Sequence, residues 1–182
     1  MLTAEQEQEI IAQILAGDKE QYALIVKEYQ SAVNNLCYKL TSNTLDADEI
    51  TQQVFIELYT ALPRFRYASR LSTFIYRITV NVIAKMIKYN KRIISYKYET
   101  TESNTVDYQQ PYEEQIVKNE QQRRLREAIG KLKHEQRTAL VLYSFKDFSY
   151  QDIADVMQVS LSKVESLIFR AKKNLKKMNL NF

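Results

Sequence analysis

The sequence predicts an all-α protein made of two small helical domains joined by a flexible acidic linker. Glycine and proline contribute only two residues each to the 182, and 45% of residues are hydrophobic, a composition that favours helices over loops or disorder. Apolar residues recur at helical spacing through residues 1–92 and again towards the C-terminus. Residues 93–115 are polar and lack such a period. We therefore expect domains at 1–92 and 116–182, with a linker at 93–115.

The N-terminal domain is expected to be a bundle of four helices around a shared core. Its helix boundaries are marked by capping and helix-breaking residues. These are Thr3 with Gln6 at the first helix, Gly17 and Asp18 before the second, Asp46 with Glu49 at the third, and Pro63 after it. The fourth helix is expected to end near Arg92. The residues that we assign to its buried face are Phe74, Ile75, Ile78 and Val82.

Composition excludes several classes of protein. The single Cys37 cannot form an internal disulfide, no apolar run approaches the roughly 20 residues needed to cross a bilayer, and the polar N-terminus is unlike a secretory signal. His134 is the only histidine, and no Cys/His cluster, Gly-rich loop or nucleophile–base pair is evident. We expect a cytoplasmic protein that is not an enzyme, has no cofactor or metal and does not insert into membranes.

Charge is distributed in blocks along the chain. Residues 63–98 carry nine basic residues and no acidic one, and residues 123–182 carry thirteen basic against six acidic residues. The intervening segment 99–122 carries one lysine against six acids, and residues 1–62 are acidic as well. Two basic blocks separated by an acidic one predict two surfaces that bind polyanions.

The stretch SYQDIADVMQVSLSKVESLIFRAKKNLKK, residues 149–177, predicts a helix-turn-helix. Ser149 and Ser160 can each cap a helix, with a turn at Gln158 between the two helices. The small Ala154 allows the second helix to cross the first closely. In a helix-turn-helix the second helix enters the major groove of DNA, so duplex DNA is the expected ligand.

Residues 131–177 resemble region 4 of the extracytoplasmic-function (ECF) sigma factors, bacterial proteins of the sigma-70 family. The family's Leu-Pro-x-x-x-Arg opening matches residues 132–137, with Lys133 in place of Pro. Its Glu-Ile-Ala and Arg-Ala-Arg/Lys motifs match residues 152–154 and 170–172. The resemblance implies that this domain reads the −35 promoter element and binds the flap of the polymerase β subunit. The expected −35 contacts are Ser162, Lys163, Glu165, Ser166, Phe169, Arg170 and Lys173.

Three residues depart from the family pattern. Gln158 stands in the turn where the family usually has Gly, so either the turn avoids a positive φ or its backbone is strained. Glu165 and Leu167 stand where the family usually has basic residues. The loss of these charges weakens attraction to phosphates, and Glu165 could instead accept a hydrogen bond from a cytosine amino group. We therefore expect a −35 sequence that differs from the family norm.

Residues 45–92 resemble region 2 of the same family. The motif Thr-Trp-Leu-Tyr-Arg-Ile-Ala-x-Asn matches residues 73–81, with Phe74 for Trp and Thr79 for Ala. In the family this helix and the loop before it capture an unpaired base of the −10 element, a role that suits aromatic and cationic side chains. The expected −10 contacts are Arg64, Arg66, Tyr67, Ala68, Ser69, Arg70, Thr73, Tyr76, Arg77, Asn81, Lys85 and Lys88. The expected contacts with the β′ clamp helices of the polymerase are Asp48, Glu49, Gln52, Gln53, Phe55 and Glu57.

The resemblance implies a bacterial sigma factor that binds core RNA polymerase, directs promoter recognition and melting, and has an anti-sigma factor as a possible partner. The acidic linker suits a path through the basic channel of the polymerase, with an inert tether as the alternative. Another alternative for the whole chain is a stand-alone helix-turn-helix regulator, which would bind duplex DNA as a dimer and would not need the aromatic, acid-free block at 63–98. The sequence leaves open whether the two domains pack together.

Overall fold

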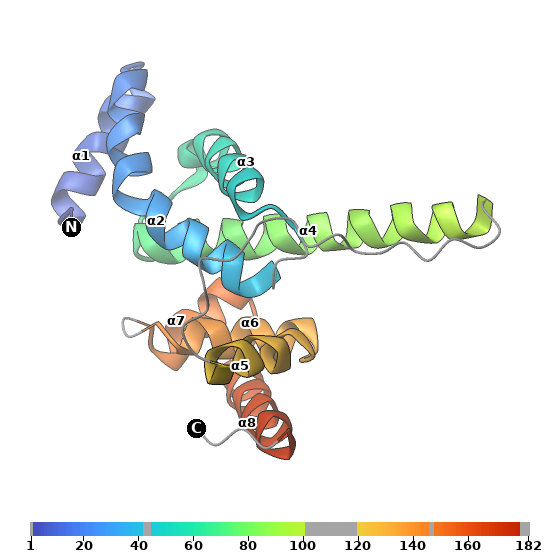
Figure 1. Cartoon of the computed structure of the whole chain (residues 1–182). Helices are drawn as coiled ribbons and strands as arrows, with labels where there is room; N and C mark the ends of the chain where they lie inside the picture. The colour runs from blue at the N-terminus through green and yellow to red at the C-terminus, as the bar shows by residue number, and fades with distance from the viewer. Residues whose placement is uncertain (1, 42–44, 101–119, 146–147, 179–182) are drawn as a thin grey trace.

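The structure is a computed structural model that describes residues 2–41, 45–100, 120–145 and 148–178. The regular secondary structure of these ranges is helical (Figure 1). The elements are α1 (Ala4–Leu15), η1 (Lys19–Gln21), α2 (Tyr22–Thr41), α3 (Ala47–Ala61), η2 (Leu62–Arg64), α4 (Leu71–Thr100), α5 (Glu120–Gly130), α6 (His134–Tyr143), α7 (Tyr150–Met157) and α8 (Leu161–Lys177), where η denotes a 3-10 helix. Helices α1–α4 form the N-terminal domain and α5–α8 the C-terminal domain.

The predicted starts and ends of the first and third helices are confirmed, whereas Asp18 caps the short helix η1 that precedes α2. The Thr3 hydroxyl accepts a hydrogen bond from the Gln6 amide at 3.2 Å, and the Gln6 side chain accepts one from the Thr3 amide at 2.9 Å. These bonds satisfy amide groups that have no partner within a helix at its start. Gly17 follows α1 with φ +110°, Asp46 caps α3 through the amides of residues 48 and 49, and Pro63 lies in η2 directly after α3.

The first part of α4 lies among the other helices, where it packs against α2 and α3 and also against α7, and its C-terminal part extends beyond them (Figure 1). Phe74, Ile75, Ile78 and Val82 are at most 9% exposed, which confirms their assignment to the core. Burial of large apolar side chains of this kind contributes about 1.5–3 kcal/mol each to stability. The buried face of α4 therefore gives a rigid support to the loop before α4 and to the exposed face of the same helix.

Helix α4 is longer than predicted. It ends at Thr100 rather than near Arg92, so the first eight residues of the predicted linker are helical. The sequence there, IISYKYET, contains no glycine or proline and nothing else that would stop a helix that is already formed. The rest of the predicted linker, 101–115, lies outside the described residues.

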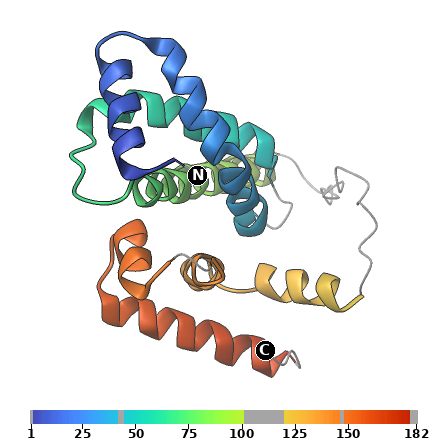
Figure 2. The same cartoon turned by 90° about the vertical axis from the view of Figure 1, so that its left-hand side faces the viewer.

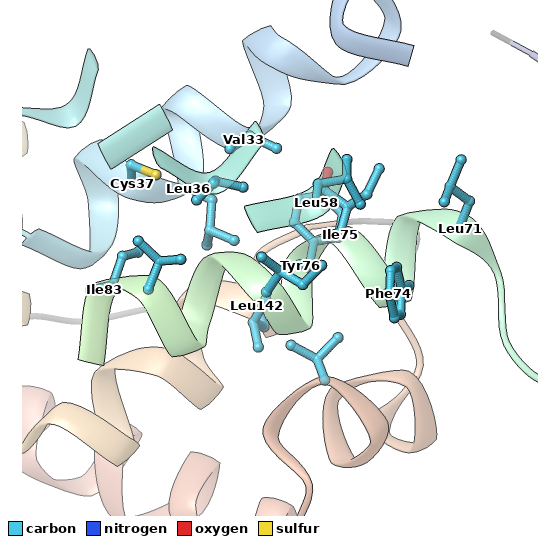
Figure 3. Close-up of a cluster of buried hydrophobic side chains, with 14 of the residues drawn as sticks. Val33, Leu36, Cys37, Leu58, Leu71, Phe74, Ile75, Tyr76, Ile83 and Leu142 are labelled. Carbon is cyan, nitrogen blue, oxygen red and sulfur yellow. The ribbon is translucent and has the colours of Figure 1, made fainter. Parts of the chain in front are cut away.

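The two domains pack against each other, which answers the question that the sequence left open. Buried residues of α2, α3 and α4 are continuous with those of α6, α7 and α8 in one hydrophobic core. Figure 3 shows Tyr76 of α4 and Leu142 of α6 in the same cluster of side chains, and Figure 2 shows the C-terminal domain lying along one side of the N-terminal domain. Within the described ranges, no helix has the length and apolar character required to cross a membrane.

Candidate nucleic-acid interface

The loop between α3 and α4 presents an aromatic side chain from a strained backbone. Tyr67 has φ +56°, a left-handed conformation that few residues other than Gly adopt, and its side chain is exposed. The Phe65 ring lies 4.9 Å from the Tyr67 ring and 4.9 Å from that of buried Phe74, measured between centroids. Packed aromatic rings thus support the exposed ring of Tyr67. Strained residues of this kind cluster at binding sites, where the surrounding structure holds them in place.

Basic side chains continue from this loop along α4. Arg64, Arg66, Arg70 and Lys88 are exposed. Between α3 and α4 lies a shallow groove of about 370 Å³. Its lining residues are Glu57, Ile78, Asn81, Ala84, Lys85 and Lys88. Lys85 Nζ lies 3.1 Å from both carboxylate oxygens of Glu57 at the groove, and because exposed ion pairs are weak, a DNA phosphate can replace this carboxylate.

All but two of the predicted −10 contacts reach the surface of the protein. Ten of the twelve residues are exposed or partly exposed, whereas Thr73 and Tyr76 are only 4% and 6% exposed. The Tyr76 ring lies 5.1 Å from that of Phe148 and 6.0 Å from that of Phe145, both in the C-terminal domain. Tyr76 can therefore meet DNA only after the C-terminal domain has moved away.

Helices α7 and α8 and the turn between them form the predicted helix-turn-helix. Ser149 and Asp152 make a capping box at the start of α7, with bonds of 2.9 and 3.1 Å, and the Ser160 hydroxyl accepts from the Lys163 amide at the start of α8. Gln158 adopts φ 54° and ψ 47°. Of the two alternatives for the turn, the strained one with positive φ is therefore correct.

Helix α8 divides cleanly into a buried and an exposed face. Its buried residues are Val164, Leu167, Ile168, Ala171 and Leu175. All seven predicted −35 contacts are exposed, and Phe169 among them is 67% exposed. Lys163 Nζ lies 2.9 Å from the Glu135 carboxylate of α6. Because Leu167 is buried, its departure from the family pattern falls in the core, and Glu165 alone alters the charge of the exposed face.

The predicted polymerase-binding residues lie on α3, and one of them is buried. Asp48, Glu49, Gln52 and Gln53 are exposed and Glu57 partly so, but Phe55 is only 7% exposed and fills the core of the N-terminal domain.

On the exposed face of α3, the apolar residue next to Phe55 is Ile56, which is 59% exposed, and Tyr59 lies about one turn further along and is 36% exposed. Helical periodicity could have found Ile56, because it follows Gln52 and Gln53 at spacings of four and three. The α3 face therefore combines exposed polar residues with an apolar centre.

Basic side chains also bind the two domains together, a role that the sequence did not reveal. One Arg137 nitrogen of α6 donates to the Leu40 carbonyl near the end of α2 at 2.9 Å, and its others donate to three carbonyls of the α5–α6 turn. Lys39 Nζ lies 4.9 Å from the centroid of the Phe145 ring. We call the domain contact formed by Lys39, Leu40, Tyr76, Arg137, Phe145 and Phe148 the seam.

A charge also acts across the seam. Hydrogen bonds from the Ser149 side chain, and to a smaller extent the positive charge of Arg70 in the N-terminal domain, hold the pKa of the Asp152 carboxyl below its usual range. Arg70 is a predicted −10 contact, so its charge acts on the C-terminal domain in this arrangement and on DNA in the predicted complex.

Comparisons with known proteins agree with this architecture. The family model "Sigma-70 region 2" matches residues 25–93, and "Sigma-70, region 4" matches residues 122–175. The RNA polymerase sigma-H factor of Pseudomonas aeruginosa is 32% identical over 185 residues, a match covering 97% of this chain and 95% of that protein. The ECF RNA polymerase sigma-E factor of Haemophilus influenzae is 30% identical, with 91% of each chain covered.

Solved structures share the fold. The sigma factor RpoE of Bartonella quintana, in complex with the anti-sigma factor NepR, matches with a TM-score of 0.70 at 18% identity, covering 87% of this chain and 96% of that one. CnrH in complex with the cytosolic domain of CnrY matches with a TM-score of 0.66 at 19% identity, covering 93% and 94%.

Two helical domains, one with a cationic aromatic surface and the other with a helix-turn-helix, define a DNA-binding protein of the transcription machinery. The chain belongs to the sigma-70 family, as an RNA polymerase sigma factor of the ECF type. It binds core RNA polymerase and directs it to promoters, and it is not an enzyme. This result also excludes the stand-alone regulator that the sequence allowed.

Proposed function

We propose that three surfaces divide the work of promoter recognition in this sigma factor. The loop 64–70 with the basic face of α4 holds the melted non-template strand of the −10 element. The exposed face of α8 reads the −35 element, and the α3 face around Ile56 binds the β′ clamp helices. The observation that carries this assignment is the exposed ring of Tyr67, presented by a strained loop and bordered by arginines.

The chemistry of the loop favours a single strand over a duplex. An exposed aromatic ring can stack on an unpaired base, an interaction worth about 1–3 kcal/mol, whereas bases in a duplex already stack on each other. Arg64, Arg66 and Arg70 can then pair with the phosphates of the same strand. The groove at Asn81 adds an amide that can both donate to and accept from a base edge.

The exposed face of α8 favours a duplex. Lys163, Arg170 and Lys173 can pair with phosphates or guanine edges in the major groove. Phe169 offers an apolar surface that matches the methyl group of thymine. Glu165 accepts hydrogen bonds only, so we expect it to select a cytosine amino group and to disfavour guanine edges.

The remaining partners follow from the same assignment. We infer a cytoplasmic location, because core RNA polymerase is the principal partner. RpoE and CnrH form complexes with NepR and with the cytosolic domain of CnrY, and we propose an anti-sigma factor for this chain as well. We further propose that the acidic linker follows the basic nucleic-acid channel of the polymerase, since its charge is opposite to that of the channel, and that the C-terminal domain contacts the β flap.

Transcription with reconstituted polymerase tests the three surfaces separately. Tyr67→Ala should reduce the permanganate reactivity of −10 thymines, which reports melting, by about 10-fold because one stacking interaction is lost. Tyr143→Ala, a change at an exposed tyrosine outside the three surfaces, should leave melting unaltered. Ile56→Asp should weaken binding to core polymerase, and Arg170→Ala should weaken promoter binding without affecting assembly with the core enzyme. Normal melting by the Tyr67 variant would refute the proposed −10 surface.

A further inference from the structure

We propose that the free chain binds duplex DNA through α8 while its domains are packed together, and that the packing blocks only the surface for the −10 strand. The proposal rests on the assignment of the −10 and −35 surfaces made above. It concerns the sigma factor before it meets polymerase, when the two surfaces differ in accessibility.

The −35 surface is open in the packed arrangement. Figures 1 and 2 both show α8 on the side of the C-terminal domain that faces away from α1–α3. All seven predicted contacts on α8 are exposed, including the apolar Phe169. Of these, Lys163 is paired with Glu135, which belongs to the same domain, so the pairing is unrelated to the seam. A major groove can therefore reach α8 without any movement of the domains.

The −10 surface is partly covered in the same arrangement. Helix α7, the first helix of the helix-turn-helix, packs against α4. Tyr76 is buried beneath Phe145 and Phe148, and Thr73, one helical turn before it on the same side of α4, is buried as well. The loop with Tyr67 stays exposed, so a single strand can meet ten of its twelve predicted contacts, but it meets neither Thr73 nor Tyr76 until the domains separate.

The seam can open in response to the strand itself. The positive charge of Arg70 acts on the Asp152 carboxyl across the domain contact, and Arg70 is also a predicted contact of the strand. Lys39 holds Phe145 through its charge, and Arg126 lies 3.5 Å from the Tyr38 hydroxyl at the outer edge of the contact. Phosphates compete for these cations, and exposed charges at such a rim contribute little to holding two surfaces together. Duplex binding therefore precedes opening, and the −10 strand binds after it.

A comparison of two DNA probes tests the proposal. A promoter sequence is first selected from a random library by the chain in complex with core polymerase. Its −35 half, as a fluorescent duplex, and its −10 non-template strand, as a fluorescent single strand, are then titrated with the free full-length chain. The variant Phe148→Asp opens the seam, because the packed state would bury a carboxylate against Tyr76, and small-angle scattering measures the opening. Arg170→Ala serves as the control for binding through α8.

The affinity of the duplex should change less than threefold between wild type and Phe148→Asp, while the affinity of the single strand should rise at least tenfold. Arg170→Ala should weaken only the duplex. An equal gain for both probes would show that packing covers α8 too, and no gain for the strand in an opened chain would show that Tyr76 and Thr73 are not its contacts; either result overturns the proposal.

If the radius of gyration stays at the wild-type value, Lys39→Asp is added to Phe148→Asp. A chain that remains closed even then refutes the role of the seam. Failure of the library to yield any promoter with polymerase would instead refute the proposed function, so the two failures are distinguishable.

Discussion

Replacing Gln158 with glycine should stabilise the C-terminal domain. The left-handed conformation of Gln158, with φ 54°, costs an L-residue about 1–2 kcal/mol because its Cβ approaches the next carbonyl oxygen. Glycine avoids this contact but loses about 0.5–1 kcal/mol more backbone entropy on folding than another residue. The Gln158 side chain is exposed, so little packing is lost. The expected net gain in the free energy of unfolding is about 0.5–1 kcal/mol.

Urea unfolding followed by circular dichroism measures this gain, with two matched controls. Gln151→Gly makes the same chemical change within α7, where the backbone is helical, and should destabilise by about 1 kcal/mol, plus the small contribution of its bond to Asp155. Gln158→Ala should bring no gain, because alanine keeps the Cβ. In thermal unfolding, 1 kcal/mol corresponds to a shift of about 2–4 °C for a chain of this size. Equal destabilisation by both glycine variants would refute the argument from backbone strain.

Three further predictions concern buried and capping residues. Burial raises the pKa of the Cys37 thiol to about 11. The buried neutral thiol therefore contributes fully to stability below the pKa of the unfolded thiol, and this contribution is lost as the pH rises through 11. A maleimide should label Cys37 at pH 7 only in urea, and rapid labelling of the native chain would contradict this. Ile153→Ala should lower the free energy of unfolding by about 2–5 kcal/mol, since a fully buried side chain leaves a cavity; a loss under 1 kcal/mol in urea titrations would show that the site collapses. Ser149→Ala should cost about 1 kcal/mol at pH 7. Because the lowered pKa of Asp152 stabilises the fold only above the pKa of the unfolded carboxyl, the deficit should shrink as the pH falls through the folded pKa. The part due to the bond from the Asp152 amide to the Ser149 hydroxyl should remain, so a deficit that does not shrink at all by pH 2 argues against the bonds from Ser149 to the Asp152 carboxylate.

Local signals in the sequence predicted the helix starts well. Capping at Thr3, Asp46, Ser149 and Ser160 depends on residues at most three positions away, so a single chain carries all the information needed. The exposed face of α8 was predicted for the same reason, because its buried residues recur at helical spacing. These features are determined within one or two helical turns.

Features that depend on distant residues were predicted less well. Phe55 was predicted to lie on the binding face of α3, whereas the structure exposes its neighbour Ile56 and buries Phe55. The two residues differ by about 100° around the helix, and only the position of the other helices decides which of them is buried. The burial of Tyr76 depends on Phe145 and Phe148, some 70 residues further along the chain, and nothing near Tyr76 indicates it. Prediction from sequence therefore succeeded for features set within one helix and failed where the packing of other helices or of the other domain decides which residue is buried.

The hydrogen bonds of Arg137 limit which residues can replace it during evolution. One planar guanidinium serves the carbonyls of the α5–α6 turn and that of Leu40 in the other domain, and lysine could not reproduce this set with its single ammonium group. A residue that both holds the α5–α6 turn and joins the two domains tolerates fewer substitutions than a residue with only one of these roles. Because every acceptor is a main-chain carbonyl, any residue at position 40 can supply it, and among related chains we expect this arginine to persist wherever the two domains stay packed, whatever the side chains at the end of α2.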